Sequence, residues 1–100
     1  MQAPEILDVD PKTLHLPSTR FSGADPYKLQ RQIARYGSSI QGMPLIQVYR
    51  ASDGVLLISD GVTRATRVAK LLPGVRVRVE VIGTFPKTCA HHPTVGDKLP

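Results

Sequence analysis

Apolar and polar side chains alternate most regularly near the end of the chain. Between residues 75 and 81 every second residue is a valine, and the residues between them are Arg76, Arg78 and Glu80. This period of two is typical of a β-strand with one face in the core and one in water. Shorter runs of β-forming residues predict three more strands, over residues 5–9, 45–49 and 55–59. Because Ser-Asp-Gly, a turn sequence, separates the last two runs, we expect them to form an antiparallel hairpin.

Two stretches show the spacing of three to four residues between apolar positions that is typical of surface helices. The first begins at Asp25, a capping residue followed by the proline favoured at the first helical position, and is expected to run to Tyr36 before Gly37. The second is expected over residues 62–72, before a Pro-Gly pair. Its predicted buried stripe consists of Val62, Ala65, Ala69 and Leu72.

Together these elements predict one α/β domain of the α+β kind, with at least two helices on a small mixed sheet. The chain has 100 residues, enough for one small core. We expect the domain to occupy residues 1–83, with its last strand ending at Gly83. Residues 84–100 contain three prolines and are mostly polar. They are expected to form a tail that is draped on the surface or disordered.

Charge and composition narrow the classes of partner. The net charge is +5, which favours an anionic partner such as a nucleotide or a nucleic acid. The longest apolar runs fall far short of the roughly 20 residues that span a bilayer, and no basic start leads into an apolar run as in a signal peptide. We therefore expect a cytoplasmic protein without membrane contact. Cys89, His91 and His92 have no distant second pair of ligands, so no metal site is predicted.

The strongest chemical pattern lies between residues 58 and 71. There an apolar strand breaks at Asp60-Gly61 and the chain restarts as a basic helix. The first amides of such a helix, at Gly61, Val62 and Thr63, have no partner within the helix and point outward together, which is the geometry that binds phosphate. The hydroxyl of Thr63 can donate one more hydrogen bond.

Three charged side chains accompany this turn. Arg64 and Arg67 lie one turn apart and outside the predicted apolar stripe, so both are candidates to hold phosphate oxygens in paired fashion. The competing interpretation of Arg67 is a solvated basic face. Asp60 is either a helix cap, a group that binds a ribose, a catalytic base, or a ligand of a Mg²⁺ ion that bridges it to the phosphate.

Three segments give the chain a resemblance to a known superfamily. Residues 16–20, Leu-Pro-Ser-Thr-Arg, look like its proline-and-arginine segment. Residues 42–48, Gly-Met-Pro-Leu-Ile-Gln-Val, are similar to its entry into a strand, and residues 58–71 to its turn and helix. With the order of the predicted elements, they make residues 5–82 resemble the N-terminal domain of the ParB and sulfiredoxin-like superfamily.

The resemblance implies a nucleotide ligand. Members of this superfamily hold nucleotide phosphates at the turn and helix: cytidine triphosphate in ParB partition proteins, ATP in sulfiredoxins, and ADP or ATP in free-serine kinases. It also implies that Arg20 faces the same cleft, and that ATP or CTP, with or without Mg²⁺, is the expected cofactor. Where sulfiredoxins carry their catalytic cysteine, this chain has Val62 and Thr63. Reduction of a sulfinic acid is therefore excluded.

Three kinds of function fit these observations. The first is a nucleotide- or phosphate-binding domain that is regulatory or associated with DNA. The second is an enzyme of the same fold, a phosphotransferase or a nuclease in which Asp60 is catalytic. The third is a small toxin or effector domain. Arg76 and Arg78, on the wet side of the last strand, are a separate candidate surface for a nucleic-acid backbone. The residues leave the oligomeric state open.

Overall fold

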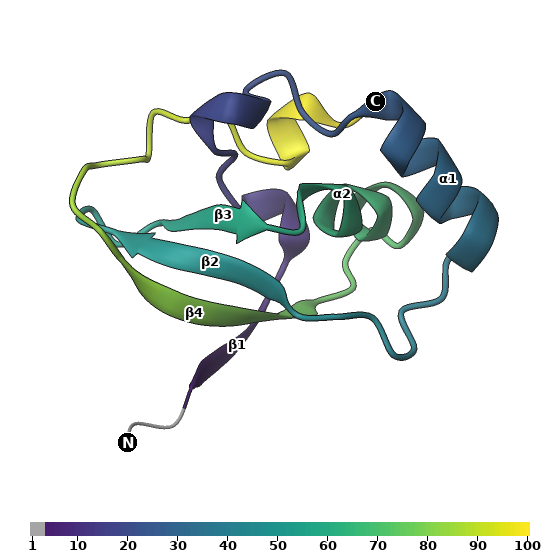
Figure 1. Cartoon of the computed structure of the whole chain (residues 1–100), viewed down its shortest axis with the longest axis horizontal. Coiled ribbons are helices and arrows are strands. Elements are labelled where there is room, and N and C mark those ends of the chain that lie inside the picture. Colours follow the sequence, from purple (N-terminus) through teal and green to yellow (C-terminus); the bar gives the residue numbers. More distant parts are fainter. Residues whose placement is uncertain (1–3) are drawn as a thin grey trace.

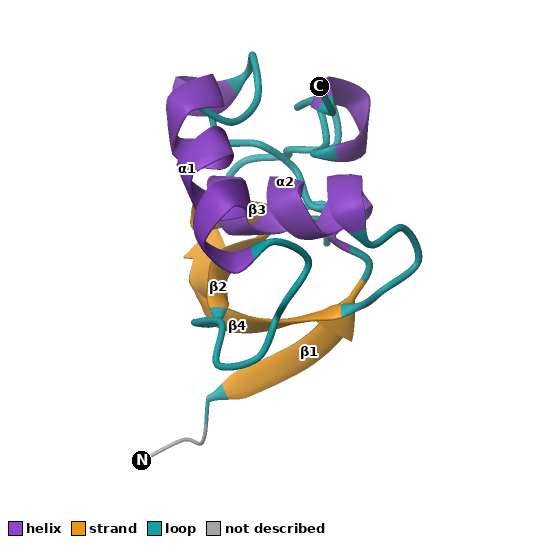
Figure 2. Cartoon of the chain, turned by 90° about the vertical axis from the view of Figure 1, so that its right-hand side faces the viewer, coloured by secondary structure: helices purple, strands orange, loops and turns teal. Residues whose placement is uncertain are grey.

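Four strands form one mixed sheet, and two helices lie on one face of it (Figure 1, Figure 2). The computed structural model describes residues 4–100; residues 1–3, which the predicted domain includes, lie outside the described residues. The strands are β1 (Glu5–Val9), β2 (Ile46–Ala51), β3 (Leu56–Asp60) and β4 (Val77–Phe85), and the helices are α1 (Pro26–Tyr36) and α2 (Val62–Leu71). The predicted α+β class, with a mixed sheet and two helices, is confirmed.

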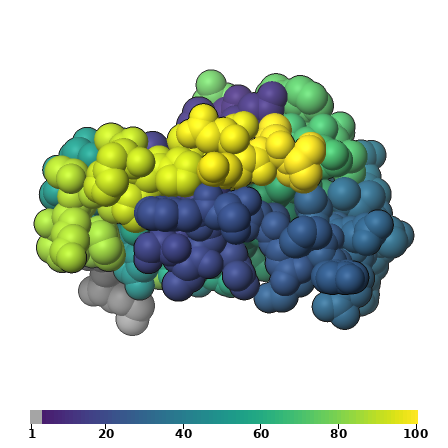
Figure 3. Space-filling model, turned by 90° about the horizontal axis from the view of Figure 1, so that it is seen from above, coloured from purple at the N-terminus to yellow at the C-terminus, as the bar shows by residue number. Residues whose placement is uncertain are grey.

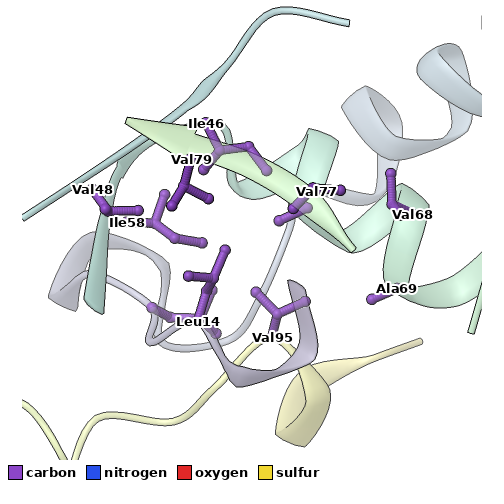
Figure 4. Close-up of a cluster of buried hydrophobic side chains, with 11 residues drawn as sticks. Leu14, Ile46, Val48, Ile58, Val68, Ala69, Val77, Val79 and Val95 are labelled. Atoms are coloured by element: carbon purple, nitrogen blue, oxygen red, sulfur yellow. The ribbon is translucent and has the colours of Figure 1, made fainter. Parts of the chain in front are cut away.

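β4 lies inside the sheet, whose strand order is β1-β4-β2-β3. It pairs antiparallel with β1 and parallel with β2, and β2 and β3 form the predicted antiparallel hairpin. The core lies between the sheet and α2; its labelled members in Figure 4 are Leu14, Ile46, Val48, Ile58, Val68, Ala69, Val77, Val79 and Val95. Because Val77 and Val79 face this core, Arg78 between them lies on the opposite face of β4 and is exposed.

α1 begins and ends where the sequence predicts. The carboxylate of Asp25 accepts hydrogen bonds from the amides of Tyr27 and Lys28, at 2.9 and 3.3 Å. These bonds, of which the one from Lys28 has the larger effect, hold the pKa of Asp25 below its usual value. Gly37 ends the helix with φ of 56°. Among the described residues, no helix has both the length and the apolar character needed to cross a membrane.

The end of the chain differs from the prediction. β4 continues through Gly83 to Phe85, because its last residues pair with β2 and these backbone bonds outweigh the weak strand preference of glycine. Beyond it, Cys89 and Val95 are completely buried. The expectation that residues 84–100 form a surface or disordered tail is therefore wrong: this segment closes one side of the core. Sequence patterns miss it because its prolines interrupt any periodicity.

Asp53, in the β2–β3 turn, fastens this last segment. Its carboxylate oxygen Oδ2 accepts hydrogen bonds from the amides of Ala90 and Cys89, at 2.8 and 3.0 Å. These bonds, of which the one from Ala90 has the larger effect, lower the pKa of Asp53. Burial raises the pKa of the Cys89 thiol. The cysteine therefore has a structural position with a disfavoured thiolate.

Two histidines also fasten the segment. His15 Nδ1 lies 2.8 Å from the carbonyl oxygen of His92, and His92 Nδ1 lies 2.9 Å from the carbonyl oxygen of Leu16. Since a carbonyl oxygen only accepts, both ring nitrogens donate. These bonds join the last segment to the link between β1 and α1. Figure 3 shows the segment in yellow beside the dark blue residues that precede α1.

Candidate functional site

β3 passes into α2 through a glycine turn. Gly61 has φ of 111° and precedes the helix, and no side chain caps it. The amide of Ala65 is bonded to the carbonyl oxygen of Gly61 at 2.9 Å. The amides before it, of residues 62–64, have no partner within the helix and face out from its start. The interpretation of Asp60 as the cap is wrong, because its carboxylate turns to Arg64 instead.

Arg64 lies folded back across the turn. Its Nη2 lies 3.2 Å from Oδ2 of Asp60 and 3.4 Å from the carbonyl oxygen of Leu45. The Arg64 side chain is 19% exposed, whereas that of Asp60 is 71% exposed. Nε of Arg64 is buried and has no hydrogen-bond partner in the described residues. The guanidinium is therefore held in place by Asp60 and the Leu45 carbonyl group, with its Nε–H group left unpaired.

Gly61 is needed for this arrangement for two reasons. Its φ of 111° lies in a region that residues with a side chain rarely adopt. In addition, a Cβ atom on Gly61 would lie 3.0 Å from Nη2 of Arg64 and 3.1 Å from Cγ1 of Ile46. Any other residue would thus strain the turn and displace the guanidinium of Arg64 or the core side chain of Ile46.

A cavity of about 440 Å³ opens in front of this turn. Three parts of the chain line it: the link before α1, one face of α1 at Lys28 and Gln32, and the β3–α2 turn. The lining residues are Pro17, Thr19, Arg20, Lys28, Gln32, Ser59, Asp60, Gly61, Val62, Thr63 and Arg64. Of the seven site residues predicted from the sequence, all but Arg67 are on this list.

The charges around the cavity favour an anion. Lys28 and Arg64 are each the third residue of their helix, where the positive end of the helix dipole makes a cation unfavourable. Both helices thus bring a cation to one cavity, against the preference of the helix itself; the start of α1 is capped by Asp25, whereas the start of α2 has no side-chain cap. Arg20 adds a third cation, and neither Arg20 nor Lys28 forms an ion pair with a described residue. Asp60 is the one carboxylate on the lining.

Arg67 does not reach this cavity. The residue is only 2% exposed, and its Nη1 donates to the carbonyl oxygens of Gly37 and Ser39, at 2.9 and 2.8 Å. Its guanidinium also lies over the ring of Tyr36, and burial lowers its pKa. The interpretation of Arg67 as part of a solvated basic face is wrong. Arg67 lies outside the predicted apolar stripe of α2, but α1 packs over that side of the helix and buries it. Arg67 holds the loop between α1 and β2.

A smaller cavity of about 140 Å³ adjoins the larger one, and Gln32 and Arg64 line both. In the described chain, three buried side-chain atoms have no hydrogen-bond partner: Oε1 of Gln32, Nε of Arg64 and Nε of Arg67. All three residues line the smaller cavity, beside Tyr36 and Met43. Leaving a buried polar atom without a partner costs about 1–3 kcal/mol, so these unpaired groups make the smaller cavity part of the candidate site.

Lys28 and Gln32 are site residues that the sequence pattern does not predict. They lie one helical turn apart on α1, a spacing that puts them on one face, but the packing of α1 against α2 decides that this face meets the turn. No protein-family model matches this chain, and no curated protein matches it.

Proposed function

We propose that the protein is a nucleotide-binding domain that holds the ligand's phosphate groups in the larger cavity. The observation that carries the proposal is the convergence of the uncapped start of α2 and three cations, those of Arg20, Lys28 and Arg64, on one cavity. The free amides of residues 62–64 and the hydroxyl of Thr63 donate to phosphate oxygens. Arg20 and Lys28 neutralise the ligand's charge. The resemblance to the ParB and sulfiredoxin-like superfamily supports the same ligand class.

The smaller cavity supports a nucleotide rather than a bare phosphate. It is lined by polar side chains, those of Gln32, Arg64 and Arg67, which suit the polar edge of a nucleobase, and by the side chain of Met43, which suits its flat face. Because the two cavities share lining residues, one ligand can place its phosphates in the larger cavity and its base in the smaller one. ATP and CTP are the nucleotides to test first.

Thermal unfolding with added nucleotide tests the proposal. At a concentration ten times Kd, ATP or CTP should stabilise the protein by about 1.4 kcal/mol, which raises Tm by roughly 5–10 °C. The variants Arg20→Gln and Lys28→Gln should lose most of this shift, because each removes an exposed cation from the cavity without touching the core. Arg78→Gln makes the same charge change on the far side of the sheet and should keep the shift. Equal losses in all three variants would refute a site at the turn.

Asp60 is predicted to weaken nucleotide binding when no metal ion is present. Its carboxylate binds Arg64 at 3.2 Å and repels a phosphate in the same cavity. The variant Asp60→Asn should therefore bind nucleotide about fivefold more tightly in the presence of EDTA, as isothermal titration calorimetry would show. Weaker binding of the variant in EDTA would contradict the placement of the phosphate beside Asp60.

The second candidate function is an enzyme, a phosphotransferase or a nuclease. It is favoured by the position of Asp60 as the one carboxylate on the lining of the cavity, where it can act as a base or as a ligand of Mg²⁺. An enzyme of this kind would turn over nucleotide or nucleic acid with Mg²⁺ present. Asp60→Asn would then stop turnover while nucleotide binding persists.

A further inference from the structure

The larger cavity continues as a groove along α1. Lys28, Gln32 and Thr63 line the cavity and also a neighbouring hollow of about 400 Å³. The other residues that line this hollow are Arg31, Arg35 and Tyr36. Because α1 packs beside α2, as Figure 2 shows, the groove leads from the β3–α2 turn along the outer helix. It therefore extends the candidate site beyond the residues that surround the turn.

The α1 side of this groove is a row of cations. Lys28, Arg31 and Arg35 lie at spacings of three and four residues, and the helix contains no acidic residue. None of the three forms an ion pair with a described residue, whereas Arg50, Arg64 and Arg78 do. The carboxylate of Asp25 caps the helix, and its pKa is lowered by the two capping bonds and, to a smaller extent, by the charge of Lys28. Since like charges at these spacings destabilise a helix, the row indicates an anionic partner.

The row extends beyond the two cavities, because neither Arg31 nor Arg35 lines them. From Lys28 to Arg35 the helix rises about 10 Å, so phosphates bound at the turn leave Arg31 and Arg35 without an anion. Tyr36, at the far end of the groove, is 49% exposed, and the guanidinium of Arg35 lies 5.4 Å from its ring centroid. An exposed ring next to an unpaired cation is the combination on which unpaired bases stack.

We propose that the site takes a single-stranded polynucleotide, with one nucleotide in the two cavities and the adjoining phosphates along Arg31 and Arg35. This rests on the proposed function, because the first nucleotide occupies the site described above. A single strand fits better than a duplex: the groove leads into a cavity lined by three parts of the chain, and the bases must be free to reach Tyr36.

Fluorescence anisotropy with labelled decathymidylate and decauridylate tests the proposal. Both oligonucleotides should bind more tightly than ATP or CTP. The double variant Arg31→Gln with Arg35→Gln should weaken oligonucleotide binding on the order of tenfold and reduce the slope of log K against log salt by about 1.4. It should leave the Kd for ATP and CTP within twofold, because neither arginine lines the two cavities. The matched control, Arg76→Gln with Arg78→Gln, should change oligonucleotide binding less than twofold.

Other results would overturn the proposal in distinguishable ways. If nucleotides bind but oligonucleotides bind no more tightly than nucleotides, the polynucleotide proposal is wrong and the proposed nucleotide site stands. If both double variants weaken oligonucleotide binding equally, the attraction is general and the groove has no special part in it. If a ten-base-pair duplex binds more tightly than either single strand, the single-strand assignment is wrong. If neither nucleotides nor oligonucleotides bind, both proposals fail.

Discussion

Replacing Gly61 with alanine is expected to abolish nucleotide binding and to destabilise the protein by roughly 2–3 kcal/mol. A Cβ atom strains the positive φ of this residue and meets Nη2 of Arg64 and Cγ1 of Ile46. To relieve the contact the guanidinium of Arg64 must leave its place, or the start of α2 must tilt. Either change alters the direction of the free amides. Chemical denaturation and nucleotide titration of the Gly61→Ala variant measure the two effects.

Gly74→Ala is the matched control for this prediction. Gly74 also has a positive φ, of 87°, but a Cβ atom there would meet nothing within 4 Å. The control should therefore lose only about 1 kcal/mol through backbone strain and should bind nucleotide like the unchanged protein. If the two variants lose the same stability and both still bind, the contacts around Gly61 do not shape the site.

Replacing Arg67 with methionine is expected to cost roughly 2–3 kcal/mol and to loosen the loop between α1 and β2. Methionine fills much of the same space, but it leaves the carbonyl oxygens of Gly37 and Ser39 without their donor. Since loss of the buried guanidinium also removes the contact with the ring of Tyr36, the end of α1 should fray. The free energy of unfolding measures the first effect, and hydrogen exchange of the amides of residues 37–44 measures the second.

Arg35→Met is the control for Arg67. Arg35 also lies over the ring of Tyr36, yet it is exposed and bonds no carbonyl group in the described residues. Its replacement should change stability by less than about 0.5 kcal/mol and leave the loop protected. Equal effects of the two substitutions would show that the loop does not depend on Arg67.

The turn could be predicted from the sequence because its signals are local. A strand that ends at Asp-Gly and continues as a basic helix places Gly61, Thr63 and Arg64 together whatever the rest of the chain does. The hairpin and α1 have equally local signals in their turn and capping residues. Arg20 could be named only through a family resemblance, and the structure places it on the lining of the same cavity.

The missed features depend on packing between distant segments. Arg67 carries a charge outside the apolar stripe of α2, which predicts an exposed position for an isolated helix, but α1 covers it. Gln32 lies on the cavity lining only because α1 packs beside the β3–α2 turn. The last segment is likewise buried through single residues such as Cys89 and Val95, which no period connects. Residues 86–100 therefore belong to the fold although nothing local predicts it.

The most direct test of the central claim is a nuclear magnetic resonance titration of the backbone amides with ATP and with CTP. The claim is that the uncapped start of α2 holds the ligand's phosphate. For at least one of these nucleotides, the amide signals of Val62, Thr63 and Arg64 should shift further than all others and saturate with one Kd. In the Arg20→Gln variant the same signals should shift only at higher nucleotide concentrations, because the Kd is larger. Shifts that do not saturate, or that centre on exposed cations such as Arg76 and leave residues 62–64 unmoved, would contradict the account.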